Sequence, residues 1–199
     1  MKIDITRASA ALCGLGLFIL TGPAFAHTET GASSGFLSGF FHPVFGVDHV
    51  VAMVAVGLWG AFLGAPAIWL LPIVFPLVMA LGGALGIAQI ELPGVETGIA
   101  LSAVILGLCV AFAFKPPLWV AAIIVGAFAI FHGHAHGAEM PDAANAMSYA
   151  LGFVIATGLL HLCGIAIGAL VRWPSGVMLV RGAGGLIAVA GGAFLSGIV

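Results

Sequence analysis

Charged residues are scarce in this sequence. Asp, Glu, Lys and Arg together make up only 6% of its 199 residues, against about 25% in soluble proteins. A water-soluble domain needs charged and polar side chains over its surface, so this scarcity excludes an ordinary soluble fold. Hydrophobic residues make up 62% of the chain, which predicts an integral membrane protein held in a lipid bilayer.

Basic residues and cysteines are few as well. Five Lys and Arg residues, with no basic patch, exclude nucleic-acid binding. The three cysteines, Cys13, Cys109 and Cys163, each stand alone in an apolar run. That placement is typical of small buried side chains and argues against a disulfide or a cysteine-ligated metal.

Sequence patterns that would indicate catalysis or ATP coupling are absent. The chain contains neither the H-E-x-x-H pattern of zinc hydrolases nor the G-x-x-x-x-G-K-[ST] loop of nucleotide-binding proteins. We therefore expect neither an enzyme nor a permanently bound cofactor, and no direct use of ATP by this chain.

The first residues have the pattern of a secretory signal. Lys2 and Arg7 precede the short apolar run ALCGLGLFILTG, and Ala24–Ala26 supplies a small-x-small cleavage site. We predict a signal peptide over 1–26, whose removal leaves His27 outside the cytoplasm. A retained first helix is the alternative, although the run is short for a membrane span.

The rest of the chain, 27–199, contains six apolar runs of the length that crosses a bilayer, about 20 residues. They cover 44–64, 67–90, 96–114, 117–137, 145–171 and 177–198. Each break between them contains proline, which disfavours helix in the preceding residue. We predict an all-α bundle of six transmembrane helices, in which sequential helices are antiparallel neighbours. Glycines spaced by four, such as Gly82 and Gly86, predict close helix packing.

Basic residues predict how the bundle is oriented. With the mature N-terminus outside, Lys115 and Arg172 fall in cytoplasmic loops and Arg181 lies near the cytoplasmic end of the last span. This placement obeys the positive-inside rule. The sequence thus predicts a multi-pass protein of the bacterial inner membrane with a periplasmic N-terminus.

One group of ionisable residues lies at the start of the first predicted span. Such residues are costly inside a membrane and usually serve a function. Pro43 suits a first helical position, so we expect His42 at the helix cap and Asp48 and His49 one to two turns inside. His42 and His49 would then share one helix face, two turns apart.

A second group ends the fourth predicted span, in the stretch FHGHAHGAE over 131–139. His132, His136 and Glu139 are spaced by four and three residues, which places them along one stripe of a helix. His134 points to the opposite side. Both groups lie at the outer ends of their spans, and we expect them to meet in one outward-facing cavity.

Imidazole and carboxylate together suit divalent first-row metals such as nickel, cobalt and zinc. The sequence predicts a metal site made by six residues: His42, Asp48, His49, His132, His136 and Glu139. A proton relay is the main competing use of such groups. Four further residues are candidates for the pathway or for supporting the ligands: Glu91, Glu96, His134 and His161. Glu91 and Glu96 could instead be ordinary loop acids, and His134 a solvated histidine. His161 could instead make a helix–helix hydrogen bond.

The two motifs together resemble the HupE/UreJ family of nickel permeases. The resemblance rests on His42-x5-Asp48-His49 and on the FHGxAHGxE pattern of 131–139, and it extends over essentially the whole mature chain. It implies secondary uptake of nickel, in some members cobalt, for hydrogenase or urease maturation. It also implies that the motif residues bind the metal, and that metallochaperones or maturation proteins are partners.

Other functions stay open at this point. The chain could be an intramembrane metalloenzyme, or a metal sensor or hydrogenase accessory protein that binds metal without moving it. A histidine-ligated transport site predicts loss of uptake at acid pH, because imidazole protonates near pH 6.5 and a protonated ring cannot bind metal.

Overall fold

A computed structural model describes residues 32–140 and 145–198. Within these ranges the regular elements are all helical, with no strand, so the predicted all-α class is confirmed. They are α2 (Ala32–Phe45), α3 (Val47–Leu63), α4 (Ala67–Ile87), α5 (Val95–Ala111), α6 (Leu118–Ala138), α7 (Ala146–Gly168), the 3-10 helix η1 (Ala169–Arg172) and α8 (Pro174–Leu195). The predicted signal peptide over 1–26 lies outside the described residues.

Four helical stretches are long and apolar enough to cross a membrane. They are Ala67–Ile87, Leu118–Ala138, Ala146–Arg172 and Pro174–Leu195. The pair α2 and α3 passes the same test only when joined, and α5 is apolar but has 17 residues. The structure therefore shows a multi-helix membrane protein, while the full count of six crossings stays a prediction.

The first predicted span, 44–64, is not one straight helix. The chain breaks at Gly46, and the axes of α2 and α3 differ by 79°. The expectation that His42 caps a helix begun by Pro43 is wrong, because both residues lie inside α2. His42 and His49 therefore lie on two helices and do not share one helix face.

Tertiary packing explains why α2 forms. A Cβ atom on Gly39 would overlap the backbone carbonyl of Tyr149, and one on Gly152 would overlap that of Phe36. Paired glycines thus let α2 and α7 approach backbone to backbone, and this contact holds a helix that the hydropathy of 32–45 does not predict.

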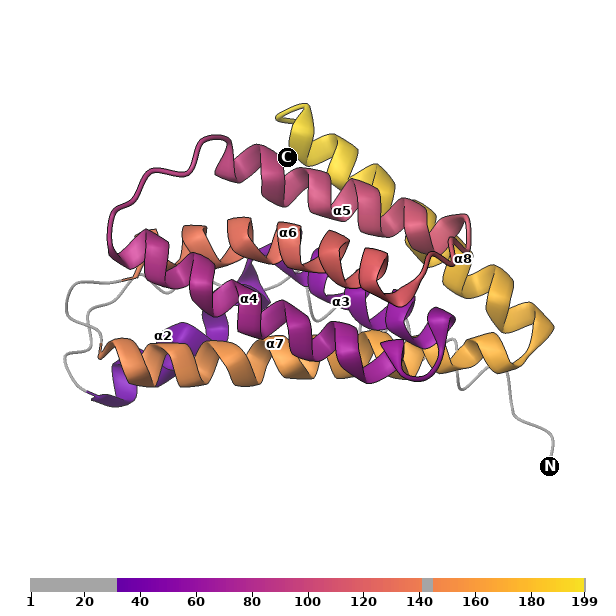
Figure 1. The fold of residues 1–199 in the computed structure, drawn as a ribbon, viewed down its shortest axis with the longest axis horizontal. Coiled ribbons are helices and arrows are strands. Elements are labelled where there is room, and N and C mark those ends of the chain that lie inside the picture. The colour runs from indigo at the N-terminus through magenta and orange to yellow at the C-terminus, as the bar shows by residue number, and fades with distance from the viewer. Residues whose placement is uncertain (1–31, 141–144, 199) are drawn as a thin grey trace.

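The helices pair in a different order from the one expected. Sequential helices were predicted to be neighbours, and α3 does contact α4, as α5 contacts α6. The more extensive contacts, however, are those of α4 with α6, of α5 with α8, and of α7 with both α2 and α3. Figure 1 shows α5 and α8 along one side of the molecule, α4 and α6 in the middle, and α7 along the opposite side. The short turns nevertheless reverse the chain direction at each end of the bundle.

Close contact between α4 and α6 positions the end of α6. A Cβ on Gly82 would overlap the carbonyl of Ile130, and one on Gly133 would overlap that of Met79. Close packing at Gly82 agrees with the prediction from its spacing. Because Gly133 allows no side chain, α6 lies flat on α4 and its histidine-bearing side is turned toward α3.

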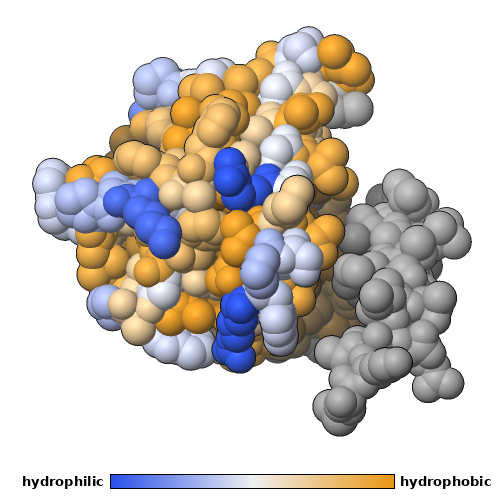
Figure 2. All heavy atoms as spheres, turned by 90° about the vertical axis from the view of Figure 1, so that its right-hand side faces the viewer, coloured by the Kyte–Doolittle hydropathy of each residue, from blue (hydrophilic) through white to orange (hydrophobic). Residues whose placement is uncertain are grey.

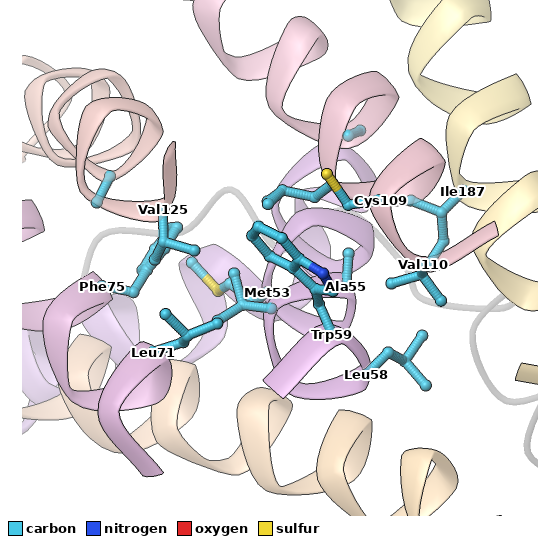
Figure 3. Packing of buried hydrophobic residues seen from close by; sticks show 14 of the residues in the cluster. Met53, Ala55, Leu58, Trp59, Leu71, Phe75, Cys109, Val110, Val125 and Ile187 are labelled. Atoms are coloured by element: carbon cyan, nitrogen blue, oxygen red, sulfur yellow. The ribbon is translucent and has the colours of Figure 1, made fainter. Parts of the chain in front are cut away.

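The interior is apolar, and so is most of the outside. Met53, Trp59 and Phe75 are fully buried at the centre of the bundle (Figure 3). Large apolar side chains such as Phe112 and Leu186 are mostly exposed. Figure 2 shows one end of the molecule, where hydrophobic surface surrounds a few separate hydrophilic patches. Lipid chains are the natural solvent for such a surface.

Basic side chains lie at one end of the bundle. The ammonium of Lys115 stands 5.2 Å from the centre of the Phe62 ring, and Arg181 Nε donates to the Ala111 carbonyl at 2.7 Å. These contacts join the ends of α3 and α5 to α8, and Arg172 ends η1 at the adjoining α7–α8 turn. The histidine motifs lie toward the opposite ends of the helices.

Candidate metal centre

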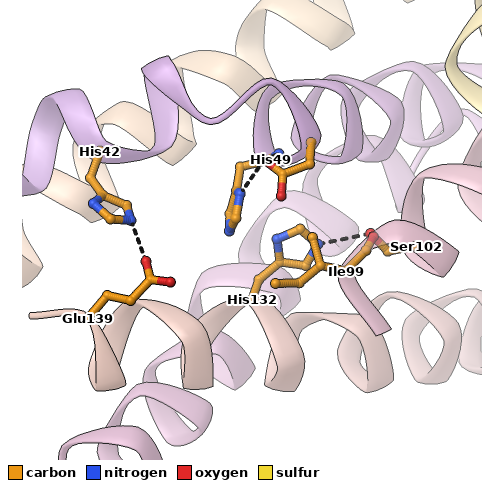
Figure 4. Close-up of polar contacts among 7 residues, drawn as sticks. His42, His49, Ile99, Ser102, His132 and Glu139 are labelled. Carbon is orange, nitrogen blue, oxygen red and sulfur yellow. Dashed lines mark hydrogen bonds and ion pairs between the residues drawn. The ribbon is translucent and has the colours of Figure 1, made fainter. Parts of the chain in front are cut away.

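Four imidazoles from three helices lie in contact (Figure 4 shows three of them). His132 and His136 stand one turn apart on α6. The first turn of α3 places His49 against both, with ring centres 4.7 Å from His132 and 4.3 Å from His136. The last turn of α2 places His42 4.7 Å from His136. The rings thus form a continuous series in the order His42, His136, His49, His132.

One end of this series opens to the surface. His42, His136 and Glu139, which we name the peripheral triad, offer ligand atoms that all lie within 4.8 Å of one another. His42 Nε2 is 3.2 Å from a Glu139 carboxylate oxygen, and these side chains are 31% and 55% exposed. Two imidazoles with a carboxylate suit a divalent first-row ion. The triad can therefore meet an ion while that ion still holds water.

The other end is closed. His49 and His132, which we name the buried pair, lie inside the bundle, and His132 has no exposed surface. His49 Nε2 and His132 Nδ1 are buried with no hydrogen-bond partner, as are both nitrogens of His136. Buried polar atoms nearly always have partners, so this concentration of free imidazole nitrogens indicates a binding role.

Asp48 orients His49. Its Oδ1 accepts a hydrogen bond from the backbone N–H of His49 at 2.9 Å and lies 2.8 Å from His49 Nδ1. A carboxylate only accepts, so Nδ1 of the neutral ring carries the proton and Nε2 keeps its lone pair. Carboxylate–histidine contacts of this kind support metal-binding imidazoles in many proteins.

Ser102 on α5 orients His132 in a comparable way. Its hydroxyl donates to the Ile99 carbonyl at 2.6 Å, and its oxygen lies 2.8 Å from His132 Nε2. Because the hydroxyl proton is already used, Ser102 accepts from Nε2–H, which leaves the lone pair on Nδ1. That atom lies on the side of His49 (Figure 4). Ser102 was not among the predicted site residues.

The remaining predicted residues lie elsewhere. His134 Nε2 contacts the Ile90 carbonyl at 2.8 Å, away from the imidazole series. Glu91 shares a surface hollow with His134, Leu92 and Pro93. Glu96 is exposed in the first turn of α5. His161 is buried on α7 against Phe75.

The structure thus brings together all six residues predicted as ligands, with different roles. His42, His136 and Glu139 form the peripheral triad, His49 and His132 form the buried pair, and Asp48 holds His49. Of the four secondary candidates, none has a hydrogen bond or ion pair to this cluster within the described ranges. Metal binding itself stays a prediction.

Comparison with known proteins identifies the family of this chain. The family described as HupE / UreJ protein matches residues 15–194, most of the sequence. The chain belongs to the HupE/UreJ family. A curated relative, Protein HupE of Rhizobium leguminosarum bv. viciae, is 48% identical over 197 residues, which cover 98% of each chain. No solved structure matches.

Membership of the HupE/UreJ family confirms the resemblance predicted from the two motifs. The family is associated with nickel and cobalt transport and is of transporter type. The apolar helices agree with a multi-pass membrane protein of this family.

Proposed function

We propose that this protein is a secondary transporter that takes up Ni²⁺ across the bacterial inner membrane. The observation that carries the proposal is the series of four imidazoles, which leads from the peripheral triad, open to the surface at His42 and Glu139, to the closed buried pair. Cobalt is the alternative cargo, because the same ligand set suits both ions.

The peripheral triad captures the ion. The Glu139 carboxylate supplies charge at the surface, and His42 and His136 replace part of the ion's water shell. Neighbouring rings in the series have centres 4.3 to 4.7 Å apart. Rings this close can turn their nitrogens toward one ion, which metal–imidazole bonds of about 2.0–2.1 Å would then hold.

His136 takes part both in capture by the peripheral triad and in transfer to the buried pair, because its ring contacts His42 on one side and His49 on the other. The ion passes to the buried pair as His49 and His132 replace His42 and Glu139, one ligand at a time. Stepwise exchange keeps the ion bound without trapping it, which a transport site requires.

We further propose that the mature chain crosses the membrane six times after removal of the signal peptide 1–26. Helix α5, with 17 residues, spans about 25 Å at 1.5 Å per residue, so it crosses a core of about 30 Å together with its flanking turns. The separation of Lys115, Arg172 and Arg181 from the histidine motifs supports a periplasmic site and N-terminus.

The membrane potential supplies the driving force in this proposal. An inside-negative potential favours entry of a divalent cation by about 4.6 kcal/mol per 100 mV, twice the value for one charge. Uptake then needs no ATP. On the cytoplasmic side we propose metallochaperones or hydrogenase or urease maturation proteins as recipients, as the resemblance to the HupE/UreJ family implies.

Radioactive nickel uptake by expressing cells tests the proposal. The intact protein is compared with His132→Ala and Asp48→Ala at matched membrane levels, with unlabelled cobalt as competitor. Uptake that depends on both residues supports the mechanism. Uptake that is absent from the intact protein, or that survives both substitutions, overturns it and favours a protein that binds metal without moving it.

A further inference from the structure

Helix α7 presents a regular stripe to the interior beyond the imidazole series. Tyr149, Phe153, Thr157 and His161 are spaced by four and all buried, so they follow one helix face. The stripe starts at the peripheral triad, where the Phe153 ring centre is 4.1 Å from that of His136. It runs toward the C-terminal end of α7, the end that carries Arg172.

His161 is the most unusual residue of the stripe. Only 1% of it is exposed, and neither ring nitrogen has a hydrogen-bond partner. It lies eight residues beyond Phe153, about 12 Å along the helix. Its ring packs against Phe75, with ring centres 5.3 Å apart, and Phe75 also contacts His132, at 5.5 Å. The Pro72 carbonyl of α4 lies near this ring, but the two do not form a hydrogen bond of good geometry.

Thr157 adds a second polar atom without a partner. It is fully buried, and its Oγ1 makes no hydrogen bond, either as donor or as acceptor. Threonine in a helix commonly bonds the carbonyl one turn earlier, so a free buried hydroxyl is unexpected. Residues four apart on a helix have Cβ atoms about 5–6 Å apart, which makes Thr157 a direct neighbour of His161.

Helix α4 supplies a third polar atom, a backbone carbonyl oxygen. Pro72 and Pro76 both lie inside it. Proline has no N–H, so Pro76 cannot bond the Pro72 carbonyl as a helical residue normally would. This freed carbonyl lies near the His161 imidazole. An imidazole nitrogen and a carbonyl oxygen thus lie near each other in the interior, with the Thr157 hydroxyl one helical turn away.

We propose that Thr157, His161 and the Pro72 carbonyl form an inner cation site that receives the ion from the buried pair. The inference rests on the proposed transport function. Nitrogen and oxygen ligands without thiolate fit a divalent first-row ion. The site has no carboxylate, so it binds more weakly than the peripheral triad and favours onward release.

Nickel stoichiometry of the detergent-purified protein tests the site directly. The peripheral triad and the buried pair share His136 and together hold one ion, so equilibrium dialysis at saturating Ni²⁺ should find two equivalents. His161→Leu should leave one, and so should His49→Ala/His136→Ala. The combined triple variant should bind none. A His161→Leu protein that still binds two equivalents overturns the inference.

Uptake separates this inference from the function on which it rests. We expect His161→Leu to lower the initial rate of radioactive nickel uptake about tenfold or more, equal to about 1.4 kcal/mol, and Thr157→Val several-fold. Leu162→Ala, which changes a lipid-facing residue of the same turn that is 51% exposed, should leave uptake unchanged.

His161→Cys should recover part of the uptake, because it restores a metal ligand without the ring. Failure of the intact protein to take up nickel contradicts the transport function, whereas the dialysis result still decides the inner site. Full uptake by a stable His161→Leu protein contradicts the inner site alone.

Discussion

Removal of the Ser102 hydroxyl should weaken nickel binding although Ser102 need not touch the metal. In the structure this hydroxyl donates to Ile99 and accepts from His132 Nε2–H, which keeps the His132 Nδ1 lone pair toward His49. Ser102→Ala leaves the ring free to place its proton on either nitrogen and to turn within its space. Part of the population then presents N–H to the ion.

The size of the effect follows from these contacts. A hydrogen bond to a neutral group contributes about 1 kcal/mol, and loss of a residue that supports a metal-binding histidine typically costs about 10–100-fold in affinity. We expect nickel affinity to fall about tenfold, or about 1.4 kcal/mol. The methyl group of alanine fits the space of serine, so thermal stability should change little.

Two measurements on purified protein check this prediction. Nickel titration gives the affinity, and the ¹⁵N chemical shifts of the His132 ring report which nitrogen carries the proton. Ser196→Ala is a matched control, because Ser196 also donates to the carbonyl three residues earlier, at 2.9 Å, without a histidine contact. The control should change neither readout.

Unchanged affinity in Ser102→Ala, together with an altered proton position, would refute the link between His132 orientation and binding. An unaltered ring proton position would refute the assignment of the hydrogen bonds themselves.

Three further predictions concern capture, packing and pH. Glu139→Gln removes the charge 3.2 Å from His42. Uptake measured over a series of nickel concentrations should show a half-maximal concentration raised about tenfold and a smaller change in the maximal rate. Gly133→Ala should destabilise the protein by about 1–3 kcal/mol, because its methyl group meets the Met79 carbonyl. Gly182→Ala, a change in helix α8 with open space around it, should melt at or above the temperature of the intact protein, because alanine favours a helix more than glycine does. Uptake should be lost at acid pH, because a protonated imidazole cannot bind Ni²⁺, and the loss should come below the usual imidazole range because burial opposes the charged form of the ring; uptake that increases as the pH falls would contradict histidine ligation.

Hydropathy predicted most of the fold. The predicted spans 67–90 and 117–137 correspond to α4 and α6, with starts within one residue. Long apolar runs identify such helices because the bilayer requires them. The pairing of α4 with α6 was not predictable, since it depends on glycines that meet backbone carbonyls across the interface.

The bend at Gly46 was missed for a related reason. The sequence allows Pro43 either to start a helix or to lie in its last turn, and the choice is made by α7, which packs on α2 at Gly39. This bend brings His42 to the peripheral triad and leaves His49 to the buried pair. A straight helix would have kept both histidines on one face.

The candidate site was predictable where spacing within one helix decides it. His132, His136 and Glu139 do line one side of the end of α6, and His134 turns away. Ser102 carried only a weak signal, as a single hydroxyl in an apolar run. Its contact with His132 depends on how α5 meets α6, and no local pattern specifies that.

Nickel flux into proteoliposomes under an imposed inside-negative potential tests the central claim most directly. The comparison is between the intact protein, His136→Ala, which removes the ring shared by the peripheral triad and the buried pair, and Leu186→Ala, a change on the exposed surface of α8. We predict saturable influx for the intact protein and Leu186→Ala, and none for His136→Ala. Influx that persists in His136→Ala, or an intact protein that binds nickel without moving it, would contradict transport along the imidazole series.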